Sequence, residues 1–286
     1  MHIAIIGCGV VGGAYARALK EQANLSLCDI VSEGRPGALA REMGLPLHDA
    51  PGPWLEGCDF AIAAVPGRES PVAAAAALPF LPEHCLYVDV STGAPAAMRG
   101  AAADFAAQGR DFVDTAILGA VDLTGGATPV LIAGEQAARA QQIFEIMGAP
   151  VQRLAEGKPG DAVALKLLRS VVVKNIECAA VECLTAADAL GVRERLLEMF
   201  ADIDAKPFRD LLASLATTHI QHAERRMHEM EEAAAQLREL GFDAAVTGAL
   251  EQRYKATLAH QEKSPPGEAH ASLDQALAWL SASAKS

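Results

Sequence analysis

The sequence is poor in aromatic residues and in basic side chains relative to acidic ones. Aromatics make up 5% of its 286 residues, and 24 Lys and Arg stand against 36 Asp and Glu, for a formal net charge of −12. A nucleic-acid partner requires a basic face, so this balance argues against one. It leaves the charge of a small substrate open, because the local charge of a cleft can oppose the net charge.

Long uncharged apolar runs and closely paired cysteines are also missing. No apolar stretch reaches membrane-spanning length without a charge, and a strand begins at His2, so we expect neither a membrane contact nor a signal peptide. His219 and His222 lack a third ligand, so we expect no metal. We expect a cytoplasmic protein in which all the cysteines, none in a C-x-x-C pair, are small buried side chains: Cys8, Cys28, Cys58, Cys85, Cys178 and Cys183.

The chain does contain a glycine-rich turn at its start. The apolar residues 3–6 lead into GCGVVG at residues 7–12 and then into strong helix formers. Strand, glycine turn and helix in this order are typical of a dinucleotide-binding fingerprint. Gly7 allows the tight turn, Gly9 lets the backbone approach a pyrophosphate, and Gly12 lets the helix pack on the strand. The other interpretation is an ordinary strand–turn–helix with purely structural glycines.

An acidic residue supports the dinucleotide interpretation. Asp29 follows the next predicted strand, residues 25–28, where a carboxylate accepts hydrogen bonds from a ribose 2′-hydroxyl and repels a 2′-phosphate. We therefore predict NAD, while Arg35 in the same loop keeps NADP as the alternative. The residues expected to bind the cofactor are Gly7, Gly9, Val10, Val11, Gly12, Asp29, Val65, Pro66 and Ser91.

The chain changes character near residue 157. Before it, apolar strands alternate with helices, which predicts an α/β fold with a doubly wound parallel sheet. After it we find only helical periodicity, divided into about five helices by breaks near residues 206, 241 and 265. We predict a Rossmann dinucleotide-binding domain at residues 1–157 and an all-helical substrate and dimerisation domain at residues 158–286.

Residues 161–190 predict one long helix that is apolar around most of its circumference. We expect it to be buried on nearly all sides, in a homodimer whose helical domains interlock. A polar stripe interrupts it, because Arg169, Ser170 and Glu177 fall within about 60° of Lys166 around the helix axis. A lysine in this setting needs a partner or a role, and desolvation lowers its pKa toward the range of acid/base catalysis. The alternative is a structural lysine that snorkels or forms a salt bridge.

Three motifs resemble the β-hydroxyacid dehydrogenase and 6-phosphogluconate dehydrogenase superfamily. GCGVVG fits its cofactor loop, DVSTGAP at residues 89–95 fits its D-x-S-T-x-x-P turn, and Gly160 with Lys166 resembles the opening of its catalytic helix. The resemblance, which extends to about residue 190, implies that Lys166 is the general acid/base during hydride transfer. It also implies that Ser91 lies near the nicotinamide.

The sequence departs from the family at two positions. Leu118-Gly119-Ala120 stands where the family has a Ser-Gly-Gly that grips the substrate carboxylate, and Ser170 stands where it has an asparagine. The helical half looks more like a poorly characterised branch of NAD(P)-dependent oxidoreductases. A second long helix, residues 208–240, offers His222 and Arg226 as a substitute anchor for a small anionic substrate, or as a solvated face with ion pairs. The expected substrate-binding residues are Ser91, Thr92, Gly119, Ser170, His222 and Arg226.

Together these features predict an NAD(P)-dependent oxidoreductase that acts on CH–OH donors, a small hydroxy acid or its oxo partner. Reduction of an imine or enamine is the alternative within the same hydride chemistry. Decarboxylation is also open, although Glu177 lies roughly 16 Å from Lys166 along the helix axis, too far for joint action on one small substrate. From another class, Leu118 favours a non-catalytic NAD-binding sensor.

Overall fold

Strands close to the expected positions form one eight-stranded sheet in the computed structural model of the chain, which describes residues 1–268 and 271–284. Apolar β-type runs with fully buried side chains make up its central strands. Contacts divide the chain into two compact units, Met1–Ser170 and Val171–Ser286. The strands, all in the first unit, are β1 (His2–Ile6), β2 (Asn24–Cys28), β3 (Leu47–His48), β4 (Phe60–Ala63), β5 (Leu86–Asp89), β6 (Asp111–Ile117), β7 (Val130–Ala133) and β8 (Val151–Arg153).

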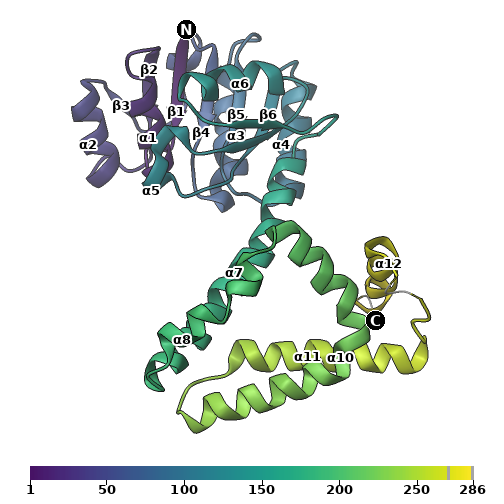
Figure 1. Cartoon of the computed structure of the whole chain (residues 1–286). Coiled ribbons are helices and arrows are strands. Elements are labelled where there is room, and N and C mark those ends of the chain that lie inside the picture. Colours follow the sequence, from purple (N-terminus) through teal and green to yellow (C-terminus); the bar gives the residue numbers. More distant parts are fainter. Residues whose placement is uncertain (269–270, 285–286) are drawn as a thin grey trace. The chain divides into compact units, whose positions relative to one another are not determined.

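The strand order is β3-β2-β1-β4-β5-β6-β7-β8 (Figure 1). The chain reverses direction across the sheet between β1 and β4, which is the switch point where doubly wound folds bind ligands. The prediction of a wholly parallel sheet was wrong for β7, which pairs with β6 in antiparallel register. A parallel return usually runs through an α-helix that packs on the sheet, whereas the link between these strands contains only the four-residue helix α5 (Val121–Thr124) and one 3₁₀ turn.

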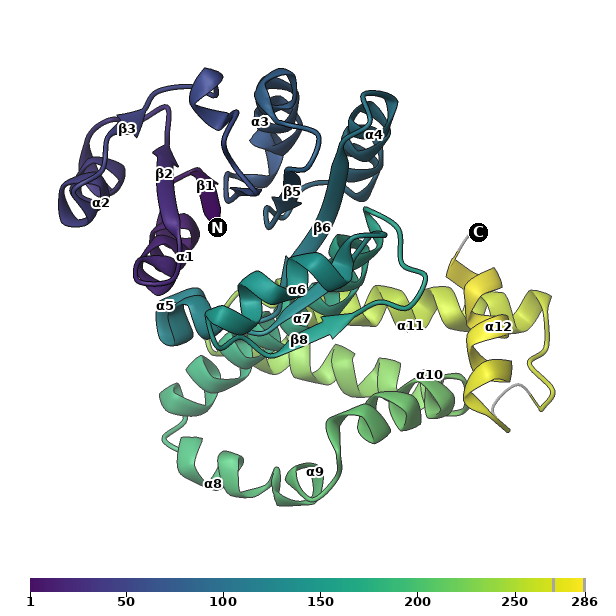
Figure 2. The same cartoon turned by 90° about the horizontal axis from the view of Figure 1, so that it is seen from above.

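Helices cover both faces of the sheet (Figure 2). Because side chains alternate along a strand, Ile3 and Ile5 of β1 pack toward Phe144 on one face, whereas Ala4 and Ile6 pack toward Phe105 on the other. This burial on both faces fixes the strand ends that form the site. The helices of the first unit are α1 (Val10–Leu19), α2 (Gly34–Met43), α3 (Ser70–Ala77), α4 (Pro95–Ala107), α5 (Val121–Thr124) and α6 (Ala137–Ile146).

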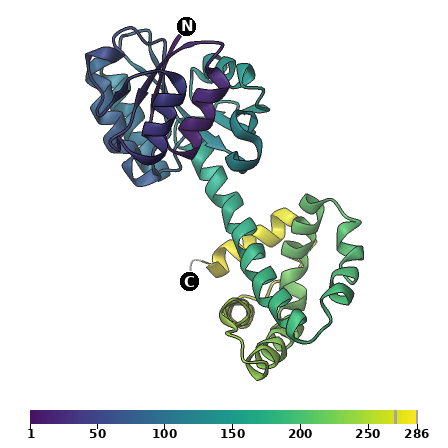
Figure 3. The ribbon, with the colours of Figure 1, turned by 90° about the vertical axis from the view of Figure 1, so that its left-hand side faces the viewer.

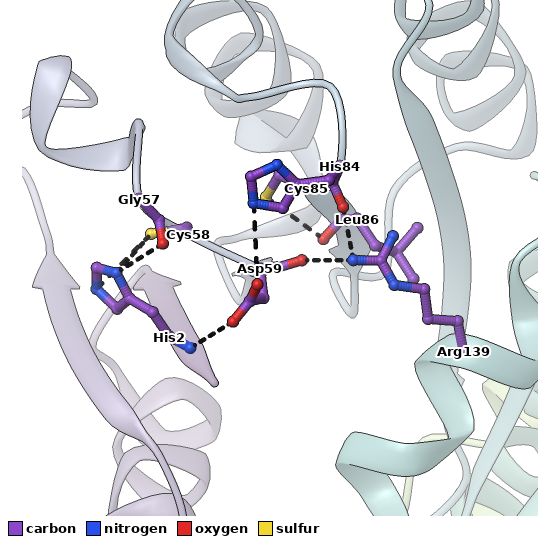
Figure 4. Close-up of polar contacts among 8 residues, drawn as sticks. All are labelled: His2, Gly57, Cys58, Asp59, His84, Cys85, Leu86 and Arg139. Atoms are coloured by element: carbon purple, nitrogen blue, oxygen red, sulfur yellow. Dashed lines mark hydrogen bonds and ion pairs between the residues drawn. The ribbon is translucent and has the colours of Figure 1, made fainter.

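A polar cluster joins the strand starts at the edge opposite the glycine turn (Figure 4). The backbone N–H of His2 donates to Asp59 Oδ2 at 2.8 Å. Arg139 of α6 donates to the carbonyl oxygens of Asp59 and His84, at 3.0 and 2.5 Å, and lies 4.9 Å from the ring centroid of Phe60. One guanidinium therefore ties α6 to the starts of β4 and β5.

The second unit is helical, as expected. In the part that the structure describes, α7 (Asp161–Ala189) and five further helices follow β8, against about five helices predicted in total. The long helix ends close to its predicted end at residue 190 and is followed by Gly191, with a φ of 69°. The additional helix arises because the segment before α10 forms two short helices, α8 and α9. α10 and α11 lie side by side (Figures 1 and 2). The helices after α7 are α8 (Arg193–Glu198), α9 (Ala201–Asp204), α10 (Phe208–Glu239), α11 (Ala245–Lys263) and α12 (Leu273–Ala284).

Helix α7 is continuous (Figure 3), and its residues 161–170 belong to the first unit. The expectation that α7 is buried on nearly all sides was wrong for the single chain. An apolar pattern predicts that a helix face is covered, but it does not identify the chain that covers it. Cys178 and Cys183, also expected to be buried, are exposed on the same helix. The open aliphatic side chains include Leu165 at 44%, Leu168 at 65%, Val171 at 60%, Ile176 at 49% and Val181 at 60% exposure.

Candidate active site

The glycine turn between β1 and α1 is packed as tightly as the sequence suggested. Gly7 has a φ of 92°, and a Cβ there would lie 2.5 Å from the carbonyl oxygen of Ala64. A Cβ at Gly12 would lie 1.9 Å from the carbonyl oxygen of Gly7. Around Gly9, by contrast, a Cβ would meet nothing within 4 Å. Gly7 and Gly12 are thus required by packing within the fold, whereas Gly9 faces open space.

That open space lies at the start of α1, where the N-cap is Gly9. No side chain caps the helix, and its first turn contains no acidic residue. The first N–H groups of a helix have no partners within it, and they carry the positive end of the helix dipole. These residues fit the pyrophosphate of a dinucleotide, which needs this combination of bare backbone and unpartnered donors.

Asp29 is a structural part of the same turn, a role that the sequence did not indicate. Its Oδ2 accepts the N–H of Cys8 at 2.7 Å, and its Oδ1 accepts the N–H of Val31 at 2.9 Å. The carboxylate therefore ties the end of β2 to the glycine loop. The neighbouring Cys8 is buried, and this burial raises the pKa of its thiol to about 12, so it remains protonated. A cavity of about 370 Å³ beside Gly9 includes Arg35 in its wall.

A second cavity of about 460 Å³ opens at the switch point. Its volume suits a small molecule or part of a cofactor. The structure brings most of the predicted site residues to its wall, whereas Ser170 does not line it. Asp122 of α5 was not anticipated and lines both cavities. The predicted residues that line the larger cavity are Val10, Val11, Val65, Pro66, Ser91, Thr92, Gly119 and Lys166.

Lys166 is half-buried, and its Nζ donates a hydrogen bond to Thr92 Oγ1 at 2.6 Å. Desolvation lowers the pKa of the amine, and the negative charge of Asp114 partly opposes that shift. A larger fraction of neutral amine is therefore present near neutral pH than for a free lysine. The group stands next to a cavity and has a hydroxyl partner, so it can both accept and return a proton.

The turn that carries Thr92 is held by buried polar groups. Ser91 Oγ accepts the N–H of Val65 at 3.2 Å and lies 3.4 Å from the carbonyl oxygen of Ala63, so its hydroxyl is bonded to the end of β4. Asp89 accepts the N–H of Ser91 at 2.8 Å and the hydroxyl of Ser70 at 2.6 Å. Burial raises the pKa of Asp89 to about 6. These bonds hold the turn in place under the cavity.

Asp114, another residue that sequence reasoning missed, is fully buried at β6 beside Asp89 in the strand register. It accepts backbone N–H groups from the first turn of α7. The sequence does contain a signal that could have identified Asp114, namely a carboxylate within an apolar strand that precedes a predicted cleft. A buried carboxylate needs hydrogen-bond donors, so such a residue is expected to hold a neighbouring element.

His222 and Arg226 lie in the second unit, on α10. Arg226 Nη2 donates to Thr218 Oγ1 at 3.0 Å, and among the described residues it forms no ion pair, whereas Arg225 pairs with Glu229. His219 Nε2 lies 2.8 Å from Thr257 Oγ1. Burial, together with Arg253 and Arg226, lowers the pKa of His219 to about 4.

In residues 1–268 and 271–284, no group of three His, Cys, Asp or Glu side chains could hold a metal, and no helix meets the length and hydropathy needed to cross a membrane.

A doubly wound sheet whose switch point carries an uncapped glycine-turn helix defines a dinucleotide-binding protein. The family model for the NAD binding domain of 6-phosphogluconate dehydrogenase matches residues 2–157. The chain belongs to this family, and it is an NAD(P)-dependent oxidoreductase with a 3-hydroxyacid dehydrogenase-like fold. A second model, a domain of unknown function called DUF1932, matches residues 187–257.

Individual relatives agree with this assignment. An uncharacterised 28.5 kDa protein of Methanothermus fervidus is 25% identical over 80% of this chain and 88% of its own. A conserved protein whose structure was described as similar to 3-hydroxyacid dehydrogenases is 26% identical, with a TM-score of 0.59, over 91% of this chain and 98% of that one. An imine reductase variant of Myxococcus stipitatus in complex with NAD+ has a TM-score of 0.74 at 18% identity, over 90% and 93% of the two chains, and another structure of that organism's imine reductase holds NADP+. These last two share the fold.

Proposed function

We propose that this protein transfers a hydride between NAD and a small hydroxy acid or its oxo partner, with Lys166 as the general acid/base. The observation that carries the proposal is the position of Lys166, whose amine is bonded to Thr92 at the wall of the switch-point cavity that also contains Val10 and Val11 of the glycine turn. Nicotinamide, when bound, supplies the hydride acceptor or donor. The chain must then move one proton at the substrate oxygen.

Lys166 is suited to that proton transfer in both directions. The neutral amine accepts the hydroxyl proton during oxidation, and the ammonium returns it during reduction. The lowered pKa increases the fraction of neutral amine relative to a free lysine, and the hydroxyl of Thr92 orients the amine. Ser91, Thr92 and Gly119 line the same cavity as Lys166 and are therefore the strongest candidates for substrate contacts. Ser170 is the weakest candidate because it does not line the cavity.

The test compares Lys166→Ala with Lys174→Ala in NADH-linked assays on a panel of oxo and hydroxy acids. Lys174 is the matched control, because it lies on the same helix but is exposed and paired with Glu177. We expect Lys166→Ala to lower kcat by about 10²- to 10⁴-fold without changing the Kd for NADH. Lys174→Ala should match the wild type. Full turnover in Lys166→Ala would contradict the proposed role.

The preference for NAD rests on Asp29, whose carboxylate lies at the end of β2 and repels a 2′-phosphate. Arg35, in the wall of the cavity beside Gly9, is the residue that would favour NADP. The ratio of kcat/KM for the two cofactors decides between them. A clear preference for NADP would refute the argument from Asp29.

We further propose that His222 and Arg226 bind the anionic group of the substrate. Among the described residues the guanidinium of Arg226 has a hydroxyl partner but no carboxylate partner, which leaves it available to a carboxylate or phosphate. A hydrogen bond to a charged group contributes about 1.5–3 kcal/mol, so Arg226→Ala should raise KM roughly 10- to 150-fold. Arg225→Ala, which breaks an exposed pair with Glu229, is the control and should leave KM unchanged. Equal KM values in all three proteins would exclude the anchor.

The helical half, residues 158–286, is also proposed to form a homodimer through α7. The exposed aliphatic side chains of this helix, with Leu168 and Val171 among the most open, match a surface that a second copy of the chain would bury. Sedimentation velocity should give the mass of a dimer, and Leu168→Glu should shift it to a monomer. A wild-type chain that sediments as a monomer at micromolar concentration would exclude the dimer.

Imine or enamine reduction is the second candidate, favoured by the fold shared with the imine reductases. It needs the same hydride geometry but a proton donor to nitrogen, so a panel that adds cyclic imines distinguishes it from the first. An NAD-binding sensor would bind NADH and turn over neither panel. Lys166→Ala would then leave the only measurable property, NADH binding, unchanged.

A further inference from the structure

Asp114 is a carboxylate that the proposed reaction does not use directly, although it lies at the start of the helix that carries Lys166. Its side chain is fully buried at β6. Oδ2 accepts the N–H of Gly160 at 2.9 Å and the N–H of Val163 at 3.1 Å. It thus holds the first turn of α7, although it comes from a distant part of the sequence.

The start of α7 leaves little freedom for another arrangement. Gly160 has a φ of 98°, and a Cβ there would lie 2.7 Å from the carbonyl oxygen of Pro95 and 3.1 Å from Arg99 Cγ. Val163 is fully buried in the core between α7 and the sheet. Because α7 continues without a break from its first turn through Lys166, the position of this turn sets the direction of Lys166 toward Thr92.

The charge of Asp114 also acts on Lys166. The positive end of the α7 dipole opposes an ammonium placed close to it, and a carboxylate at that end compensates. Asp114 forms no ion pair among the described residues, and its Oδ1 accepts no hydrogen bond there, so its charge is only partly neutralised by the donors of α7. Besides Asp114 and Lys166, the charged groups on the surrounding elements are Asp89 on β5, Asp122 on α5, Arg99 on α4, and Asp161 and Arg169 on α7.

We propose that Asp114 is the positioning residue of the catalytic amine: one buried carboxylate fixes the turn that aims Lys166 at Thr92 and places a negative charge at the start of the helix that carries Lys166. The statement about catalysis rests on the proposed function of Lys166. The statement about charge does not, because it concerns the titration of the amine in the protein alone.

The experiment replaces the charge but keeps a hydrogen-bond acceptor, in Asp114→Asn. Asp161→Asn is the matched control, because Asp161 also caps the start of α7, by accepting the N–H of Lys158, but is not fully buried. Lysines carrying a ¹³C label at Cε are titrated by NMR in the full chain, with Lys166→Ala to assign the resonance. The pH dependence of kcat/KM is measured in parallel, and circular dichroism with NADH binding establishes that each variant is folded.

We expect Lys166 to titrate at lower pH in Asp114→Asn than in the wild type, and at the wild-type pH in Asp161→Asn. The limb of the kcat/KM profile that reports Lys166 should move in the same direction, with the Kd for NADH unchanged. Unaltered titration of Lys166 in folded Asp114→Asn would overturn the inference, and a purely structural carboxylate would give that result. If Asp114→Asn does not fold, Asp114→Ser provides a smaller uncharged acceptor for the same titration.

The two proposals fail in different ways. If Lys166→Ala retains turnover, the acid/base role is wrong, while the NMR comparison still reports whether Asp114 sets the charge of the amine. If Lys166→Ala is inactive but Asp114→Asn has the wild-type titration and pH profile, the acid/base role stands and the role of Asp114 is wrong.

Discussion

Gly9 and Gly12 belong to the same motif, yet the structure predicts opposite consequences when each is replaced by alanine. A Cβ at Gly9 meets nothing within 4 Å, and its φ of −74° lies outside the left-handed region that favours glycine. The stability of Gly9→Ala should therefore stay within about 1 kcal/mol of the wild type. At Gly12 the Cβ would lie 1.9 Å from the carbonyl oxygen of Gly7, which forces α1 away from β1.

The expected magnitudes follow from these contacts. Overpacking of this severity costs about 3 kcal/mol, and alanine regains about 1 kcal/mol of helix propensity in α1, which leaves a net loss of about 2 kcal/mol in Gly12→Ala. For a domain of this size, Tm falls by roughly 4–8 °C. In Gly9→Ala the methyl group instead occupies the space for the pyrophosphate. Loss of one hydrogen bond to a charged group, about 1.5–3 kcal/mol, raises the Kd for NADH roughly 10- to 150-fold.

The assays are thermal unfolding by circular dichroism and titration of NADH fluorescence. Gly100→Ala is the control, because Gly100 lies within α4 and a Cβ there also meets nothing within 4 Å. It should lower neither Tm nor affinity. If Gly9→Ala binds NADH as tightly as the wild type, the pyrophosphate does not lie against the start of α1, and the proposed position of the cofactor is wrong.

Two further predictions concern stability. Arg139→Ala should destabilise the first unit by about 1–3 kcal/mol in chemical unfolding, because it removes the side-chain donor to the carbonyl oxygen of His84 and one of two donors to that of Asp59, and it uncovers the ring of Phe60. Exposed Arg68→Ala should have no effect. The pKa of Asp89 is about 6 in the folded chain and 3.8 in the unfolded one, so its contribution to stability is fully present below pH 3.8 and is lost as pH rises through 6. Relative to Asp89→Asn, the wild type should lose on the order of 3 kcal/mol over that range, and a constant difference would disprove the burial argument.

Local sequence patterns predicted most of the first unit. Strands such as β4 and β5 are short apolar runs bounded by turn residues, so their existence follows from composition and their ends are correct to within a few residues. The antiparallel β7 was not predictable in this way. Its residues are as apolar as those of a parallel strand, so no local pattern sets its direction, which only the pairing with β6 in the folded sheet shows.

The residues of the candidate site divide in the same way, into those that a local pattern predicts and those that it does not. Gly7, Gly9 and Gly12 are adjacent in sequence, so their joint role could be predicted from spacing. Thr92 and Asp114 act on α7 from other elements, and no local pattern reports a partner so far along the chain.

By itself the sequence determined the glycine turn, the two-part organisation and the presence of a lysine in an apolar helix, because each of these depends on neighbouring residues. Only the tertiary structure decided what that lysine faces, because pairing of β5 with β6 brings the Thr92 turn and Asp114 to the start of α7. Neither the sequence pattern nor the single folded chain identifies what covers the exposed apolar face of α7, because an apolar pattern predicts burial without identifying the covering surface.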